Sequence, residues 1–173
     1  IQSGMYDMVI TGGLSNTVSN IVVSGFNQVL AMSVNPDPDT ASRPFTKNRD
    51  GFIMGEGSGC IILESEEHAK ARGARIRCEL AGASMTCEAF NMTAPKTDGE
   101  GMAEAIQAAL DDAGMSPDEI GYINAHGTST NLNDLYETMA IKKVFGENAY
   151  NIPVSSIKAA IGHTLVAGGA LEG

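Results

Sequence analysis

Two histidines stand where the sequence could support acid–base or electrophilic chemistry. His126 and His163 each end a strand-like segment, lie beside a glycine and open onto Thr or Ser hydroxyls. Loops at strand ends are where α/β folds place their sites, and a neutral imidazole can donate a hydrogen bond to a carbonyl oxygen. Lys158 lies five residues before His163. On these residues alone, two interpretations are equally supported: the histidines form a catalytic pair, or both are structural.

Three other patterns suggest chemistry more weakly. Ser155 and Lys158 have the SxxK spacing of a Ser/Lys hydrolase, but no SDN-like or KTG-like element accompanies them. The glycines of residues 55–59 precede a predicted strand, whereas a phosphate-binding loop follows a strand and opens a helix, so a tight turn is favoured. His68 lies on a charged helix and no HExxH spacing occurs, so we predict no metal site.

Strand-like and helix-like segments alternate along the chain, which predicts an α/β layered fold around these residues. The expected strands cover residues 7–13, 59–63, 76–85, 120–125 and 152–156. The expected helices cover residues 16–31, 65–72, 98–113, 133–145 and 164 onward. Three prolines in residues 36–51 predict a loop without regular structure.

Composition excludes several classes of protein. The 173 residues carry 11 Lys and Arg against 21 Asp and Glu, a net charge of −10, which argues against nucleic-acid and membrane binding. No apolar run approaches the ~20 residues that span a bilayer, and we expect no secretory signal. Three cysteines without a CxxC spacing favour a reducing cytoplasmic location, with a plastid as the alternative.

Several motifs together resemble one family. Residues 124–130 read NAHGTST, and the SSIK of residues 155–158 is followed by Gly162-His163-Thr164. The runs ASRPF at 41–45, RDGF at 49–52 and GEG at 55–57 are typical of the same proteins. On these motifs the chain resembles the β-ketoacyl synthases, the condensing enzymes of fatty-acid and polyketide synthesis, and in particular the elongating synthases of dissociated bacterial systems.

The resemblance implies a fold and an assembly. It implies the thiolase-like fold, in which two αβαβα halves form a layered structure, present here incompletely. Residues 1–70 would be the end of the N-terminal half, and residues 71–173 the start of the C-terminal half. Whole synthases of this family are normally homodimers.

The resemblance also implies an acyltransferase reaction, a decarboxylative Claisen condensation in fatty-acid biosynthesis. A cysteine takes the growing acyl chain from acyl carrier protein, and malonyl carrier protein then loses CO2. His126 and His163 would stabilise the resulting enolate, and Lys158 would orient and polarise the histidines through local hydrogen bonds. No cofactor is implied, because the substrates are carried on the phosphopantetheine arm of acyl carrier protein, the expected partner.

Further residues take roles by the same resemblance. Thr128 and Thr130 correspond to residues that contact the phosphopantetheine arm, and Phe26 to a residue of the acyl pocket. Buried acidic positions that support the site correspond to Asp134, Glu137 and Glu172.

The chain departs from the family pattern in four ways. The nucleophilic cysteine is expected upstream of residue 1, and Cys60, Cys78 and Cys87 are expected to be inert. The glycine-rich gating loop near the family's C-terminus is also absent. Asn91, within a loop of residues 87–93, replaces a family histidine and is expected to alter gating. Val166 replaces a glycine and is expected to tighten packing near the site. This chain alone is therefore expected not to catalyse condensation, and to expose sheet edges and apolar faces.

Alternatives remain open at this point. One is a non-catalytic subunit that resembles a chain-length factor, and another is a polyketide ketosynthase. The Ser/Lys hydrolase is a third. Because acyl carrier proteins are acidic, docking also requires a local basic patch, for which Arg72, Arg75 and Arg77 are candidates beside the simpler interpretation as a solvated helix end.

Overall fold

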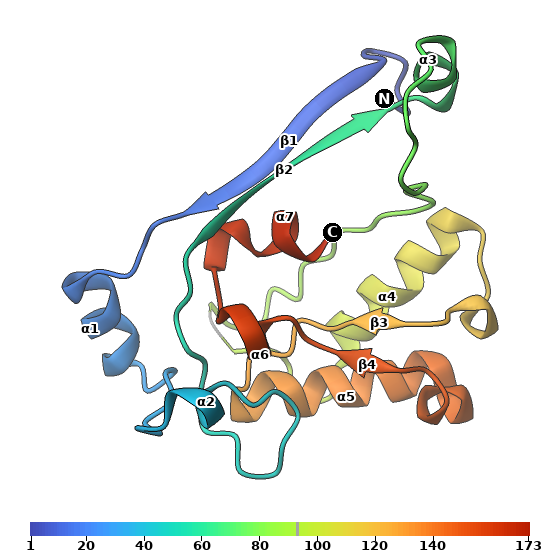
Figure 1. The fold of residues 1–173 in the computed structure, drawn as a ribbon. Helices are drawn as coiled ribbons and strands as arrows, with labels where there is room; N and C mark the ends of the chain where they lie inside the picture. The colour runs from blue at the N-terminus through green and yellow to red at the C-terminus, as the bar shows by residue number, and fades with distance from the viewer. Residues whose placement is uncertain (93) are drawn as a thin grey trace.

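A computed structural model describes residues 1–92 and 94–173 (Figure 1). A long antiparallel ribbon crosses the molecule, formed by β1 (Met8–Ser15) and β2 (Gly57–Glu64). The register runs from Met8 opposite Glu64 to Ser15 opposite Gly57. The C-terminal helix α7 (Gly168–Glu172) packs against this ribbon. Both strands were expected from their apolar runs; β1 begins one residue later and ends two residues later than expected, and β2 is longer at both ends.

A second layer contains the main apolar core. Here β3 (Ile123–Asn124) pairs in parallel with β4 (Val154–Ser155), beside α4 (Glu100–Ala113) and α5 (Asn131–Phe145) (Figure 1). Short 3-10 turns follow α4 and α5, at Pro117–Glu119 and Gly146–Tyr150. The buried cluster comprises Leu110, Ile141, Phe145 and Ile152. Their burial fixes the two helices on the parallel pair and so positions the loop after β3.

Shorter elements complete the order. They are α1 (Asn20–Gln28), α2 (Pro38–Ala41), α3 (Glu66–Ala71), α6 (Lys158–Ile161) and a 3-10 turn at Leu165–Ala167. The expected helices at 16–31 and from 164 onward, and the strand at 120–125, are therefore shorter or more divided than predicted.

The prediction that prolines exclude regular structure from residues 36–51 is wrong. Pro38 begins α2, in the first turn, where the missing backbone N–H costs no hydrogen bond. Asp37 caps this helix, because its side chain accepts a hydrogen bond from the Asp39 amide at 3.1 Å.

The prediction of a strand at residues 76–85 is also wrong. The segment runs along α4, where the Ala83 amide donates to Asp112 Oδ2 at 2.9 Å and the Ser84 hydroxyl donates to the Ala105 carbonyl at 2.6 Å. Within the described ranges, no strand pairs with it. A segment of alternating polarity forms a strand only when a neighbouring strand pairs with it through backbone hydrogen bonds.

Apolar side chains cover one face of the ribbon without being buried. Ile10, Leu14 and Ile62 are 65%, 70% and 58% exposed. The expected exposed apolar face is thus present. Among the helices of the described residues, none has both the length and the apolar character needed to cross a membrane.

Candidate active site

The two histidines that the sequence singled out face one another. Their ring centroids lie 5.3 Å apart, with the rings nearly perpendicular at 87°. The Phe52 ring contacts His163 edge-on at 5.3 Å, and Phe26 contacts Phe52 at 5.2 Å. A continuous row of four rings therefore runs from α1 to the end of β3. Phe26, the expected acyl-pocket residue, stands at the far end of this row from His126.

Backbone contacts fix His163 from both sides. Its amide donates to the Ile53 carbonyl at 2.7 Å, and its carbonyl accepts from the Gly55 amide at 2.9 Å. Its Nδ1 accepts from the Leu165 amide at 3.1 Å. In the neutral ring this contact assigns the proton to Nε2, which becomes the donor available to a substrate. Gly55 is required here, because a Cβ atom would lie 2.2 Å from the Ile161 carbonyl oxygen.

Glu137 holds the loop that carries His126. Its Oε1 accepts from the His126 amide at 2.6 Å, and its Oε2 accepts from the Gly127 amide at 2.8 Å. Gly127 has φ 43° and packs so closely that an added Cβ would lie 2.5 Å from Ser156 Cβ. Glu137 thus contacts the backbone of the histidine loop directly, and its role in supporting the site stays a prediction. The expectation that Glu137 and Glu172 are buried is wrong, because both are only half-buried.

Lys158 supplies a buried positive charge beside the histidines. It is 3% exposed, and its Nζ forms a salt bridge with Glu172. Among the described residues, the ammonium of Lys158 bonds Glu172 and no hydrogen bond joins it to either imidazole, so its orienting role through local hydrogen bonds stays a prediction. Its influence on the rings is therefore electrostatic.

Both imidazoles are held neutral. Loss of hydration is the main cause that lowers the pKa of His163 to about 4, and the charges of His126 and Lys158 contribute to the same shift. His126 is exposed as a residue, yet loss of hydration around its ring lowers its pKa, with the charge of Lys158 as the next cause. Two neutral imidazoles at pH 7 can act together as hydrogen-bond donors to an oxygen that gains negative charge.

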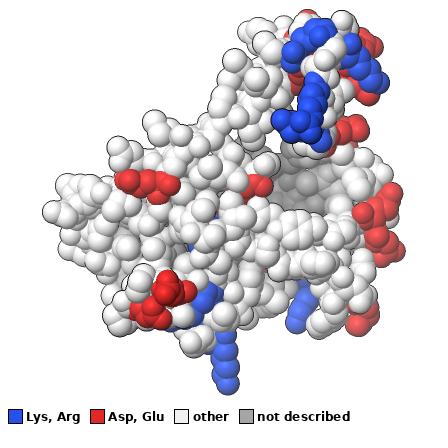
Figure 2. Space-filling model, in the orientation of Figure 1, with Lys and Arg blue, Asp and Glu red and all other residues white. Residues whose placement is uncertain are grey.

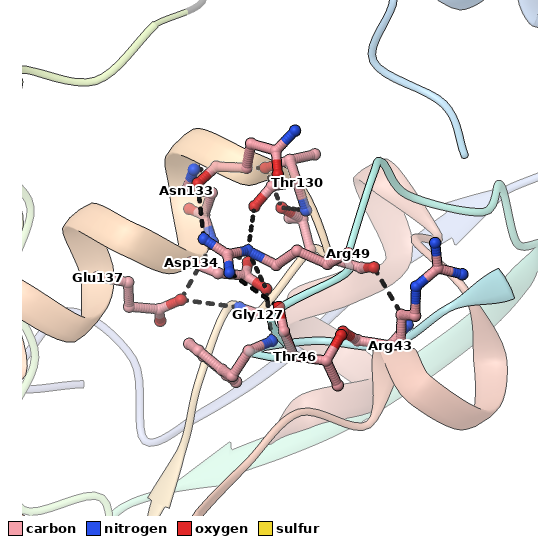
Figure 3. A network of polar contacts seen from close by, with 12 residues as sticks. Arg43, Thr46, Arg49, Gly127, Thr130, Asn133, Asp134 and Glu137 are labelled. Atoms are coloured by element: carbon pink, nitrogen blue, oxygen red, sulfur yellow. Dashed lines mark hydrogen bonds and ion pairs between the residues drawn. The ribbon is translucent and has the colours of Figure 1, made fainter. Parts of the chain in front are cut away.

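Figure 3 shows a polar network that includes Gly127 and Glu137 of the histidine loop. Asp134 is 1% exposed, and its Oδ2 accepts from the Phe45 amide at 2.7 Å. The same oxygen lies 3.6 Å from Nε of Arg49. The buried acidic position predicted at Asp134 therefore joins α5 to the loop before β2.

The two threonines expected to contact a substrate arm also organise the loop itself. Thr130 caps α5, since its Oγ1 accepts from the Asn133 amide at 3.3 Å. The Thr128 hydroxyl is paired with that of Thr130 at 2.8 Å, and Thr128 is 5% exposed. Their contact with an arm stays a prediction.

Sequence reasoning missed individual residues of the site. Phe52 is 5% exposed and lies between Phe26 and His163, and Arg49 contacts the histidine loop. Both were noted only as parts of the run RDGF. The run could have identified Phe52 and Arg49 as candidates. Their contacts, however, join segments far apart in sequence and so cannot be deduced from spacing.

Other candidates take positions outside the site. Cys60, Cys78 and Cys87 are exposed free thiols. The Ser155 hydroxyl pairs with the Tyr122 hydroxyl at 2.6 Å, and Lys158 pairs with Glu172, so the Ser/Lys hydrolase loses its base.

Two departures from the family pattern can be examined. The expectation that Val166 tightens packing near the site is wrong, because the side chain is 73% exposed. In the loop of residues 87–93, Asn91 Oδ1 accepts from the Ala94 amide at 3.0 Å. Thr93 lies outside the described residues, and the effect on gating stays a prediction.

Basic side chains gather near α3 (Figure 2). Arg72 is bound there by Glu64, with Nε and one terminal nitrogen each 2.6 Å from a carboxylate oxygen. These contacts, with His68, hold the pKa of Glu64 to about 2. Arg75 and Arg77 are exposed. The paired Arg72 favours the interpretation of this group as a solvated helix end.

Comparisons with known proteins agree with the geometry. Residues 1–69 match the model of the β-ketoacyl synthase N-terminal domain, and residues 77–173 match that of the C-terminal domain. The chain is 48% identical over 172 residues to 3-oxoacyl-[acyl-carrier-protein] synthase 2 of Staphylococcus aureus, and 50% identical over 173 residues to that of Synechocystis. Each alignment covers 99% of this chain, but only 43% of the Staphylococcus aureus protein and 42% of the Synechocystis protein.

Solved structures show the same architecture. A type II polyketide ketosynthase, solved with its acyl-carrier protein, superposes with a TM-score of 0.95 at 43% identity. A β-ketoacyl synthase from Burkholderia phymatum gives 0.92 at 41% identity. Each comparison covers 99% of this chain, and 43% and 41% of those chains. The fold is thus the thiolase-like one. Because both domain models match in order and the histidine pair stands on their motifs, the chain belongs to the β-ketoacyl synthase family.

Proposed function

We propose that this chain is the histidine-bearing part of a 3-oxoacyl-[acyl-carrier-protein] synthase, which elongates acyl chains by condensing an acyl thioester with malonyl-acyl carrier protein. The observation that carries the proposal is the pair of facing, neutral imidazoles, with the Nε2 proton of His163 fixed by the Leu165 amide. The similarity to curated 3-oxoacyl-[acyl-carrier-protein] synthases 2 supports the same reaction.

The site chemistry follows from where charge develops. When the malonyl thioester loses CO2, the carbon–carbon bond breaks and its electron pair passes to the α-carbon and the thioester oxygen. Donors from His126 and His163 stabilise that oxygen more strongly than the neutral ground state. The carbanion then attacks the acyl thioester carbon, and the cysteine sulfur leaves as a thiolate. In this proposal the nucleophilic cysteine is supplied from outside residues 1–173.

The remaining site residues would bind substrate. Phe26 would line the acyl pocket, and Thr128 and Thr130 would contact the phosphopantetheine arm. Acyl carrier protein would be the macromolecular partner, as in the solved ketosynthase complex, and the full-length protein would be a homodimer that needs no further cofactor.

A polyketide ketosynthase is the second candidate. The TM-score of 0.95 to a type II polyketide ketosynthase favours it specifically. A chain-length-factor role is less well supported, because His126, Lys158 and His163 are all retained and assembled.

Labelling of the full-length gene product tests the proposal. The protein is incubated with cerulenin, a cysteine-directed inhibitor of these synthases, and the modified residue is identified by peptide mass spectrometry. One adduct upstream of residue 1, with loss of condensation, is expected. An adduct on Cys60, Cys78 or Cys87, or no adduct at all, would contradict the enzymatic assignment.

A further inference from the structure

We propose that Arg49 is a positioning residue, which fixes the loop of His126 against the segment that holds His163. The proposal rests on the proposed function of the histidine pair. It concerns a side chain that bonds the backbone of the loop and not the histidine rings (Figure 3).

The Arg49 guanidinium connects two segments through three donors. Its Nε donates to the Thr130 carbonyl at 2.9 Å, and one terminal nitrogen donates to the Asn131 carbonyl at 2.8 Å. The other terminal nitrogen donates to the Thr46 carbonyl at 2.9 Å. The side chain is 16% exposed and lies against the fully buried carboxylate of Asp134. Because these acceptors surround a planar fork, the geometry suits arginine and not lysine.

The loop that receives these bonds needs external support. Gly127 has φ 43°, and Ser129 has φ 67°, a left-handed conformation that a serine rarely adopts. The segment that carries Arg49 supplies two more contacts. The Gly51 amide donates to the Ser129 carbonyl at 3.0 Å, and the Arg43 amide donates to Ser129 Oγ at 3.1 Å. The strained loop is therefore held by its neighbour.

The same segment also fixes the second histidine. Four residues after Arg49, the Ile53 carbonyl accepts from the His163 amide at 2.7 Å. Phe52 places its ring 5.3 Å from that of His163. One short segment thus contacts both histidine loops, and Arg49 is its most extensively bonded attachment to the loop of His126.

Variants of the full-length protein test the role. Arg49→Gln removes the donors, whereas Arg49→Lys keeps the charge opposite Asp134 but loses the fork. Lys47→Gln is the matched control, because it removes one positive charge from an exposed position of the same segment. Decarboxylation of malonyl-acyl carrier protein gives kcat and KM. Cerulenin labelling and thermal unfolding report whether each variant is folded.

Both Arg49 variants are expected to lose about tenfold or more in kcat with little change in KM, since a displacement of ~1 Å can cost about 10²-fold in rate. The kcat of Lys47→Gln should stay within about twofold of the wild-type value, a change too small to reflect misplacement of the histidine loop. Wild-type kcat in either folded Arg49 variant, or a change in KM alone, would overturn the proposal. If Arg49→Gln fails to fold, Arg49→Lys alone decides. A wild-type protein without decarboxylase activity would instead refute the proposed function.

Discussion

At the scale of single residues, the site depends on two imidazoles that remain neutral. Desolvation is the main cause for both, and the buried Lys158 ammonium adds to it. The lowered pKa has a thermodynamic consequence, since His163 binds a proton more readily in the unfolded chain. The free energy of unfolding should therefore fall as pH falls from 6.5 toward about 4.

Replacing Lys158 should move both pKa values upward. In Lys158→Met the lowering charge is lost, and the unneutralised carboxylate of Glu172 favours the protonated rings. Ring titrations by NMR in the full-length protein measure this directly. Lys70→Met is the matched control, because Lys70 pairs with Glu66 on an exposed helix. Unchanged histidine titrations in Lys158→Met would show that Lys158 does not act on the rings.

The residue types of the site could be predicted from sequence, but its contacts could not. The motifs identify His126, His163 and Lys158 because residue type and spacing are visible locally. The partner of Lys158 is a carboxylate 14 residues further on, brought close by α7. That contact depends on the folded position of α7 and so could not be deduced from local spacing.

At the scale of elements, close backbone contacts between segments place His163. Gly55→Ala should destabilise the protein and reduce decarboxylation, because the new Cβ would lie 2.2 Å from the Ile161 carbonyl oxygen. Gly25→Ala is the control, since nothing lies within 4 Å of that position inside α1. It should stabilise by about 0.5–1 kcal/mol through helix propensity.

Chemical denaturation and malonyl decarboxylation compare the two glycine variants. If Gly55→Ala were as stable as the wild type, the close contact between Gly55 and the end of α6 would not be needed for stability, which would contradict this prediction. The comparison also explains which elements sequence could predict. Strands β1 and β2 follow from their own apolar runs and pair with each other, whereas residues 76–85 lack a partner among the described strands and form none.

At the scale of the whole molecule, the exposed apolar face of the β1–β2 ribbon should prevent residues 1–173 from remaining monomeric when they are expressed alone. Helix α7 packs against the two-stranded ribbon, but a second, apolar face of the ribbon has no such cover among the described residues. Ile10, Leu14 and Ile62 remain largely exposed, so residues 1–173 expressed alone should self-associate and bind a hydrophobic dye.

Size-exclusion chromatography with light scattering measures this association. Replacing Ile10, Leu14 and Ile62 by threonine should reduce it, because threonine keeps strand propensity and lowers the exposed apolar area. A monodisperse monomer of the unmodified chain that binds no dye would contradict the expectation.

The central claim is that His126 and His163 together stabilise the enolate formed from a malonyl thioester. Release of labelled CO2 from malonyl-acyl carrier protein by the full-length protein tests it most directly. His126→Ala and His163→Ala should each lose about 10²-fold or more in kcat, the usual cost of one lost oxyanion donor. His68→Ala, outside the site, should match the wild type. Wild-type rates in either site variant would contradict the account.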